Sequence, residues 1–294
     1  MNAIEIKQLT KDYGNKKGVF DLNISVKKGE VFGFLGPNGA GKTTTIRNLL
    51  GFIRPDQGSC TINGMDCYKD AEKIQESLGY LAGEIAFLDD LTGKQMIEFI
   101  ASMKRFKDKT KMYDLMERFD LDPKGKIKKM SKGMKQKVGI VCAFMNDPDI
   151  IILDEPTSGL DPLMQNRFID LILEEKSKGK TIFMSSHIFE EIERTCDKTA
   201  IIKDGKIVAI EDMETLKEKK SKFYVVTLNS KADVDRFVKE GLDIVDINER
   251  KVTVSVNGDV LSFIKLISGY NVKDLDTKSK TLEEIFLHFY GGEK

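Results

Sequence analysis

The sequence predicts an α/β protein with a parallel-sheet core, an antiparallel β subdomain, an inserted helical subdomain and a small α+β domain at the C-terminus. Three observations predict this fold class. Short apolar runs typical of buried parallel strands occur at 31–35, 150–153 and 181–185. Apolar residues follow helical spacing, without a clear strand pattern, over 92–145. From Lys222 onward, strand and helix patterns alternate again.

The composition limits what the chain can be. With 294 residues, 40% of them hydrophobic, it can form one large domain and one small one. Lys plus Arg equals Asp plus Glu at 47 each, so the charge does not indicate a nucleic-acid partner and we expect none. No apolar run approaches the roughly 18 residues that cross a bilayer, so we expect any membrane role to go through a partner. The cysteines are Cys60, Cys67, Cys142 and Cys196; without CxxC spacing or an N-terminal signal pattern, they predict reduced core thiols in the cytosol.

Two segments near the N-terminus, 3–9 and 19–26, alternate apolar and polar residues and predict antiparallel strands with one wet face. Between them, Tyr13 stands beside a glycine turn in a segment that can fold back over a nucleotide. Stacking on adenine would contribute about 1 to 3 kcal/mol. The alternative is an ordinary half-buried turn aromatic. Another strand is expected at 59–62, before an Asn-Gly turn.

The stretch GPNGAGKTT follows the first buried-type strand and matches GxxxxGK[ST] in full. Its glycines let successive N–H groups point inward, and the dipole of a helix expected at 43–50 adds to the attraction for phosphate. We expect Lys42 to reach the β- and γ-phosphates of a nucleotide and Thr43 to reach Mg²⁺. A chance glycine-rich turn is the alternative, which the downstream sequence disfavours. The predicted phosphate-binding residues are Gly36, Pro37, Asn38, Gly39, Ala40, Gly41, Lys42, Thr43 and Thr44.

Two carboxylates follow the apolar run at 150–153. Asp154 and Glu155 would stand at the C-terminal edge of a buried parallel strand, where open α/β sheets place their ligands. We expect Asp154 to hold Mg²⁺ through water and Glu155 to act on the attacking water. A helix N-cap is the alternative. His187 follows a further predicted parallel strand, and it either reaches the same phosphate end or is structural.

Two other segments complete the pattern. Ser131 precedes Gly133 just before a helix-forming stretch, and a hydroxyl with a glycine backbone at a helix N-terminus suits a γ-phosphate. A solvated basic helix face is the alternative for 124–137. Farther on, the sequence SGLDP predicts a tight turn in which Pro162 starts a helix.

With its motifs in this order, the chain resembles the nucleotide-binding subunits of ATP-binding cassette (ABC) transporters over about its first three quarters. The resemblance implies adenine stacking by Tyr13 and catalytic roles for Lys42, Glu155 as base and His187 as switch histidine, with Asp154 as the Walker B acid. The Walker A motif would be Gly36 to Thr44. The signature would be Ser131, Lys132, Gly133 and Met134, and the D-loop Ser158, Gly159, Leu160 and Asp161.

The resemblance also implies ATP and Mg²⁺ held in a site closed between two subunits, the P-loop of one facing the signature of the other. A second ATPase subunit, identical or a paralogue, and an integral membrane permease are therefore the expected partners. The expected location is cytoplasmic, peripheral on the inner face of the cell membrane. The core would be a P-loop NTPase (RecA-like) domain over 1–221, with its helical subdomain at about 85–147.

The signature and the Q-loop depart from the family's pattern. Lys132 replaces the first glycine of the usual signature LSGGQ, while Ser131 and Gly133 keep the serine and the second glycine. By spacing, Gly83 occupies the place of the Q-loop glutamine, which the family uses toward Mg²⁺ and the attacking water. Glu84 is then the nearest side chain with ligand chemistry, and we expect it to reach the metal site directly or through water. The alternative is a surface acid in a loop that contacts the membrane partner.

The tail at 222–294 follows a charged helical connector expected at 211–220. Its element order βαββαβ is ferredoxin-like, and a last helix at 281–290 begins with the capping box TLEE. The tail resembles the accessory domain of bacterial drug-, peptide- and antibiotic-exporter ATPases. We expect it to pack on the ATPase core or on the dimer mate and to regulate closure, with His288 as a surface residue.

The favoured function is an ATP-hydrolysing subunit that powers export of a drug, an antimicrobial peptide or a similar substrate through a separate membrane subunit. The alternative is a soluble ABC-type ATPase acting on the ribosome or DNA. Such proteins usually carry two cassettes or a long coiled coil, and this sequence has neither. A P-loop kinase or GTPase would lack the signature and His187.

Overall fold

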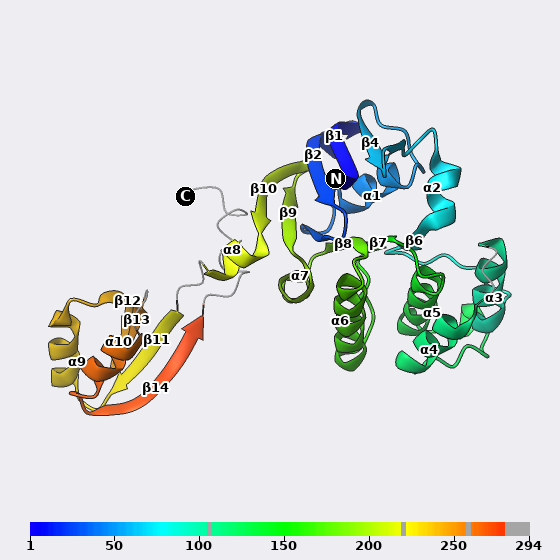
Figure 1. Ribbon diagram of the computed structural model, residues 1–294. Helices are drawn as coiled ribbons and strands as arrows, with labels where there is room; N and C mark the ends of the chain where they lie inside the picture. The colour runs from blue at the N-terminus through cyan, green and yellow to red at the C-terminus, as the bar shows by residue number, and fades with distance from the viewer. Residues whose placement is uncertain (105–107, 219–221, 257–259, 280–294) are drawn as a thin grey trace. The chain divides into compact units, whose positions relative to one another are not determined.

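The computed structural model describes residues 1–104, 108–218, 222–256 and 260–279 (Figure 1). The chain forms two compact units, Met1–Met213 and Glu214–Lys294. The division falls somewhat earlier than the 221–222 boundary that the sequence pattern suggests, because the chain leaves the first unit directly after its last strand.

A four-stranded antiparallel sheet with the order β2-β1-β4-β5 lies in the first unit. Its strands are β1 (Asn2–Asp12), β2 (Gly18–Lys27), β4 (Gln57–Ile62) and β5 (Met65–Asp66). Ile6 pairs with Ile24 on one side and with Cys60 on the other, and all three are buried. The alternation of apolar and polar residues therefore places one face in the core, as the sequence predicts.

A six-stranded sheet with the order β10-β9-β3-β8-β7-β6 forms the centre of the unit. Its strands are β3 (Val31–Leu35), β6 (Leu78–Leu81), β7 (Ile150–Asp154), β8 (Thr181–Ser186), β9 (Lys198–Lys203) and β10 (Lys206–Asp212). Every residue of β3, β7 and β8 is buried, as expected for parallel strands covered on both faces. Across the sheet, the rings of Phe32 and Phe183 stack with centroids 5.8 Å apart.

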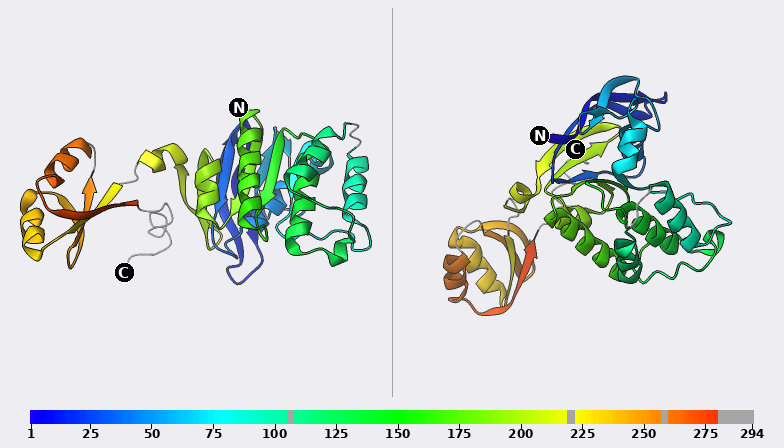
Figure 2. Two further views of the ribbon diagram at one scale, coloured as in Figure 1. Left: turned by 90° about the horizontal axis from the view of Figure 1, so that it is seen from below. Right: turned by 45° about the vertical axis from the view of Figure 1, so that its right-hand side comes forward.

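The helices of the first unit are α1 (Lys42–Leu49), α2 (Ala71–Ser77), α3 (Gly93–Met103), α4 (Thr110–Arg118), η1 (Ile127–Lys129), α5 (Lys132–Phe144), α6 (Pro162–Ser177) and α7 (Phe189–Thr195). Helices α4, α5 and α6 lie on the side of the central sheet that is turned away from the antiparallel sheet (Figure 1, Figure 2). Helix α1 contacts β2 and β4 of the antiparallel sheet as well as β7. Thr92 and Gln95 form a capping box that starts α3. Asp161 caps α6, which begins at Pro162 as the sequence predicts. The inserted segment is helical because its apolar residues repeat at helical spacing.

The connector predicted at 211–220 needs correction. Glu211 and Asp212 belong to β10 and pair with Thr199 and Lys198 of β9. Among the residues of this segment that the structure describes, α8 (Met213–Glu218) is the helical part. Glu211 and Asp212 form a strand and not a helix because β10 extends the sheet as an antiparallel edge. Its side chains alternate between half-buried and exposed positions.

The second unit is built from β11 (Lys222–Leu228), α9 (Lys231–Phe237), η2 (Val238–Glu240), β12 (Asp243–Asn248), β13 (Lys251–Val256), α10 (Val260–Ile267) and β14 (Val272–Ser279). Its four strands are antiparallel in the order β12-β13-β11-β14. Val226, Phe237, Val254 and Phe263 lie in a core of its own. The helix predicted at 281–290 and His288 lie outside the described residues.

All four cysteines are free and buried. Burial raises the pKa of Cys60, Cys142 and Cys196 to about 12 and also raises the pKa of Cys67, so these groups are thiols at neutral pH. The prediction of core thiols is confirmed. Within the described ranges, none of the helices is both long and apolar enough to cross a membrane.

Candidate active site

Three neighbouring parallel strands bring the predicted site residues to one edge of the central sheet. Leu35 at the end of β3 pairs with Ser186 at the end of β8, and Asp154 at the end of β7 pairs with Ser185. The segments that follow these strands therefore meet. They carry the P-loop, Glu155 and His187.

The P-loop backbone depends on two kinds of glycine. Gly39 and Gly41 have φ of 80° and 112°, in the left-handed region that glycine adopts without strain. A Cβ on Gly41 would also lie 2.5 Å from Val19 Cγ1. At Gly36 the lack of space alone requires glycine, since an added Cβ would lie 2.6 Å from the carbonyl oxygen of Ile202.

Lys42, the first residue of α1, carries a positive charge into the interior of the site. Its side chain is only 4% exposed. The Nζ donates to the carbonyl oxygens of Gly36 at 2.8 Å and Pro37 at 3.1 Å, and lies 3.0 Å from Glu155 Oε1. Two of these three partners are backbone carbonyl oxygens of the P-loop itself, and Glu155 is the only carboxylate among them.

Glu155 connects the P-loop lysine to the predicted switch histidine. Its Oε2 lies 3.3 Å from His187 Nδ1. The residue adopts φ of 45°, which is uncommon for a side chain of this size. Its N–H donates to the carbonyl oxygen of Ser185 at 3.2 Å and to Ser185 Oγ at 3.1 Å, which holds the turn in place. Strained backbone of this kind is typical of functional sites.

Thr43 and Asp154 supply oxygen atoms suited to Mg²⁺. Thr43 Oγ1 donates to Asp154 Oδ2 at 2.8 Å, and Ser185 Oγ donates to Oδ1 at 2.5 Å. Asp154 is 1% exposed. No group of three or more His, Cys, Asp or Glu side chains is placed to hold a metal within the described part of the chain. This donor set fits Mg²⁺, which proteins usually bind through one or two carboxylates together with substrate phosphates.

A cavity of about 700 Å³ opens in front of these groups. Tyr13 lies at its margin, 53% exposed, with Lys11 Nζ 6.0 Å from the ring centroid. Gly36, Pro37 and Ala40 shape the loop without lining the cavity, and neither Ser131 nor His187 is among the described residues that line it. The lining residues are Tyr13, Lys17, Gly18, Asn38, Gly39, Gly41, Lys42, Thr43, Thr44, Arg47, Tyr80, Ala82, Gly83, Glu84, Lys132, Asp154, Glu155 and Ser158.

Both residues at the predicted Q-loop position line this cavity. A Cβ on Gly83 would lie 3.2 Å from Asp154 Oδ2 and 3.3 Å from the Asp154 carbonyl oxygen. The backbone of Gly83 thus approaches Asp154 closely, and a side chain here would require Asp154 to shift by a few tenths of an ångström. Glu84 shares the cavity with Thr43 and Asp154.

The predicted signature packs on the predicted D-loop of the same chain. Ser131 caps α5, its Oγ accepting from the N–H of Met134 at 3.2 Å. Lys132 Nζ donates to Ser158 Oγ at 2.7 Å. A Cβ on Gly133 would lie 2.6 Å from the Gly159 carbonyl oxygen, so this glycine permits the contact.

Several residues that shape the site have no motif of their own. Arg47 lines the cavity because it stands four residues after Thr43, on the same face of α1. Lys17 and Tyr80 come from separate strand ends. Helical periodicity was a usable signal for Arg47, whereas Lys17 and Tyr80 depend on how distant segments meet.

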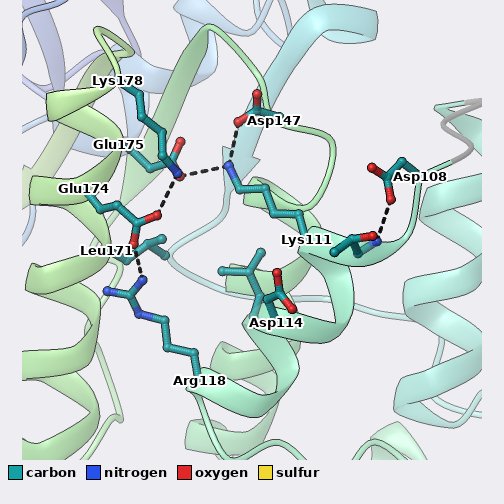
Figure 3. Close-up of a pocket in the computed structure, with 11 residues that line it drawn as sticks. Asp108, Lys111, Asp114, Arg118, Asp147, Leu171, Glu174, Glu175 and Lys178 are labelled. Atoms are coloured by element: carbon teal, nitrogen blue, oxygen red, sulfur yellow. Dashed lines mark hydrogen bonds and ion pairs between the residues drawn. The ribbon is translucent and has the colours of Figure 1, made fainter.

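A second cavity of about 460 Å³ lies between α4 and α6 and holds a network of ion pairs (Figure 3). Lys111 Nζ lies 2.7 Å from Asp147 Oδ1 and 2.8 Å from Oε1 of the fully buried Glu175. Lys178 and Arg118 both pair with Glu174, and their hydrogen bonds lower the pKa of that carboxyl. The network ties the helical insertion to the core, and no P-loop residue lines it.

Comparison with known proteins places this geometry in a family. A family model described as ABC transporter matches residues 19–158. The bacitracin transport ATP-binding protein BcrA of Bacillus licheniformis is 35% identical over 298 residues, covering 98% of this chain and 97% of that protein. The chain belongs to the ATP-binding proteins of ABC transporters.

Other relatives agree with this assignment. The linearmycin resistance ATP-binding protein LnrL of Bacillus subtilis is 31% identical over 309 residues, covering 98% of each chain. A solved structure described as the ATP-binding subunit of an ABC transporter matches with a TM-score of 0.67 at 31% identity, over 74% of this ABC ATPase and 92% of that chain. The predicted P-loop core is confirmed, and ATP hydrolysis in support of transport is the activity of the family.

Proposed function

We propose that this ABC ATPase powers export of a drug, an antimicrobial peptide or a similar compound through a separate membrane permease, working at the inner face of the cell membrane. Two relatives that match nearly the whole chain are named for bacitracin transport and for linearmycin resistance. Those names favour export of antibiotic-like compounds over action on ribosomes or DNA.

The contact between Lys42 and Glu155 carries the proposed mechanism. The Glu155 carboxylate lies 3.0 Å from Lys42 Nζ, where a phosphate oxygen of ATP would also be attracted. ATP binding would replace the carboxylate with the β- and γ-phosphates, held by Lys42 and the P-loop N–H groups. Tyr13, at the margin of the cavity, is placed to stack on the adenine.

Release from Lys42 would leave Glu155 free to orient and polarise the attacking water. His187, 3.3 Å from Glu155, would contact the γ-phosphate and respond to its loss. Thr43 and Asp154 would hold Mg²⁺, which when bound neutralises charge on the phosphate oxygens. Because phosphoryl transfer needs positioning and charge neutralisation, these residues supply what the reaction requires.

A second ATPase subunit, identical or a paralogue, would complete the site. The hydroxyl of Ser131 caps its own helix, and Ser131 lies outside the cavity formed by its own P-loop. This supports a role for the signature toward the nucleotide of another subunit. A single chain would then bind ATP but hydrolyse it slowly.

The permease would contact the surface beside Gly83 and Glu84. An apolar cavity of about 310 Å³ lies there, between the loop after β6 and helices α3 and α5. The lining includes Leu50, Phe52, Tyr80, Leu81, Ile85, Phe87 and Ile100. Phe52, and Leu88 next to Phe87 in the chain, are more than half exposed. An apolar hollow bordered by exposed apolar side chains suits a protein partner.

We also propose that 222–294 is a ferredoxin-like accessory domain. Its strand and helix order supports this assignment, as does the near-complete coverage of the two exporter-type relatives. Its role would be to contact the ATPase core or the dimer mate and regulate closure.

Two substitutions test the proposed mechanism in the full chain. Glu155→Gln removes the charge that neutralises Lys42, so we expect ATP to bind about fivefold more tightly, by roughly 1 kcal/mol, while hydrolysis is nearly abolished. Lys42→Ala should lose ATP binding. Binding is measured with a fluorescent ATP analogue and hydrolysis by phosphate release. Hydrolysis by the Glu155→Gln variant at the parent rate would show that Glu155 is not the base.

A further inference from the structure

Glu191 is a carboxylate buried inside the molecule, behind the proposed catalytic residues. It lies on α7 and is only 5% exposed. Its Oε1 accepts from Thr157 Oγ1, and its Oε2 accepts from Ser186 Oγ at 2.8 Å. Burial raises the pKa of the Glu191 carboxyl, and the two hydroxyls oppose that rise. Burying a carboxylate costs free energy of folding even when two hydroxyls donate to it. The burial of Glu191 therefore suggests a functional role.

The two hydroxyls come from the two loops that carry the proposed chemistry. Thr157 stands between Glu155 and Ser158, where the D-loop begins, and the N–H of Ser158 donates to the Glu155 carbonyl oxygen at 3.1 Å. Ser186 precedes His187, and its Oγ also accepts from the N–H of Ile188 at 2.9 Å. The Ser186 hydroxyl therefore fixes the backbone on both sides of His187.

Helix α7 gives Glu191 a rigid support. Ile192, the next residue, packs so closely on Gly33 of β3 that a Cβ on Gly33 would lie 2.9 Å from Ile192 Cγ2. Thr195 Oγ1 donates to the Glu191 carbonyl oxygen at 2.6 Å. A carboxylate held from the central sheet in this way can set the separation of two loops to within a fraction of an ångström.

We propose that Glu191 is a positioning residue for ATP hydrolysis, whose carboxylate holds Thr157 and Ser186 so that His187 faces Glu155. The proposal rests on the function proposed above for Glu155 and His187. Glu191 is not among the described residues that line the nucleotide cavity, so it acts through the two loops. It links the D-loop to the switch histidine, so that movement of one loop is transmitted to the other.

Substitutions at 191 and 190 test this role. Glu191→Ala should lower kcat about 100-fold, because small displacements of catalytic groups have effects of that size. Glu191→Gln keeps one acceptor oxygen and can donate from its amide to the other hydroxyl, so its kcat should fall only about tenfold. The KM for ATP should stay within about twofold in both. Glu190→Gln, at the exposed neighbour that pairs with Arg194, should leave kcat unchanged.

The full chain is used throughout, with its melting temperature measured for each variant. A parent-like kcat in Glu191→Ala would overturn the proposal. So would a loss in kcat matched by an equal weakening of ATP binding, or equal kcat values for the Gln and Ala variants, since both indicate a purely structural role.

A double-mutant cycle with His187→Ala separates this proposal from the one it rests on. If Glu191 acts through His187, then Glu191→Ala in the His187→Ala background should lower kcat by less than about threefold. Additive losses would contradict positioning by Glu191. An unchanged kcat in His187→Ala alone would instead contradict the role proposed for His187.

Discussion

At the scale of single residues, the charges of the site are paired within the chain. Glu155 neutralises Lys42, while Thr43 and Ser185 both donate to Asp154. When ATP and Mg²⁺ bind, Lys42 and Asp154 would exchange these internal partners for phosphate oxygens and metal. Such an exchange keeps the buried charges compensated, which limits the cost of burying them.

Glu84 stands next to Gly83, which by spacing occupies the place of the family's Q-loop glutamine. We expect Glu84→Ala, in the assembled transporter, to lower ATPase activity about tenfold and to raise the Mg²⁺ concentration needed for half-maximal rate, as loss of a residue supporting a metal does. Phosphate release measured across a Mg²⁺ titration checks this. Glu190→Ala, at an exposed residue of α7 that pairs with Arg194, is the control. Full activity and an unchanged Mg²⁺ requirement in Glu84→Ala would make Glu84 a surface acid.

Residues inside continuous motifs were predictable, and residues that depend on contacts between loops were not. Lys42, Thr43 and Asp154 follow from the P-loop pattern and from an acid after a buried strand. Glu191 looks like any acid of a charged helical turn, because only the register between β7 and β8 brings Ser186 and Thr157 to it. Gly83 was recognised as a departure, but its close approach to Asp154 needs the structure.

At the scale of elements, the apolar runs predicted the buried strands of the central sheet. Both faces of those strands are buried, so their sequences are continuously apolar and do not alternate with polar residues. Strand β10 was not predicted, and its last two residues, Glu211 and Asp212, were assigned to the helical connector because they are charged and lead directly into α8. The Asp204-Gly205 pair between β9 and β10 was the available signal, since this dipeptide favours a hairpin.

The ion-pair network between α4 and α6 makes a prediction about stability. Lys111→Met leaves the fully buried Glu175 with Lys178 as its remaining cation and removes a partner of Asp147. We expect the free energy of unfolding to fall by about 2 to 3 kcal/mol, because an incompletely compensated buried carboxylate is costly. Urea unfolding of the full chain, followed by circular dichroism, measures the change.

The matched control is Lys128→Met, which removes a surface pair with Asp90 whose side chains are 49% and 89% exposed. It should change the free energy of unfolding by less than about 0.5 kcal/mol. Equal losses in the two variants would show that the network contributes no more than a surface ion pair.

At the scale of the whole molecule, the sequence predicted two units because strand and helix patterns alternate again from Lys222 onward, after a charged connector. Each unit has its own core, with Phe32 and Phe183 in the first and Phe237 and Phe263 in the second. The boundary was less predictable, since β10 and α8 share a charged segment that satisfies either a helix or an edge strand.

Truncation after Lys220 tests what the second unit contributes. All residues that line the nucleotide cavity precede the cut and the first unit keeps its core, so the truncated chain should bind ATP with an unchanged Kd. If the second unit regulates closure, ATP-dependent dimerisation should weaken by roughly tenfold, about 1.4 kcal/mol, and the ATPase rate should change with it. Analytical ultracentrifugation of the Glu155→Gln form, with and without the tail, measures the dimer directly. Identical dimerisation and identical ATPase rates would leave the second unit without a role in closure, whereas a loss of ATP binding would show that it supports the fold of the first.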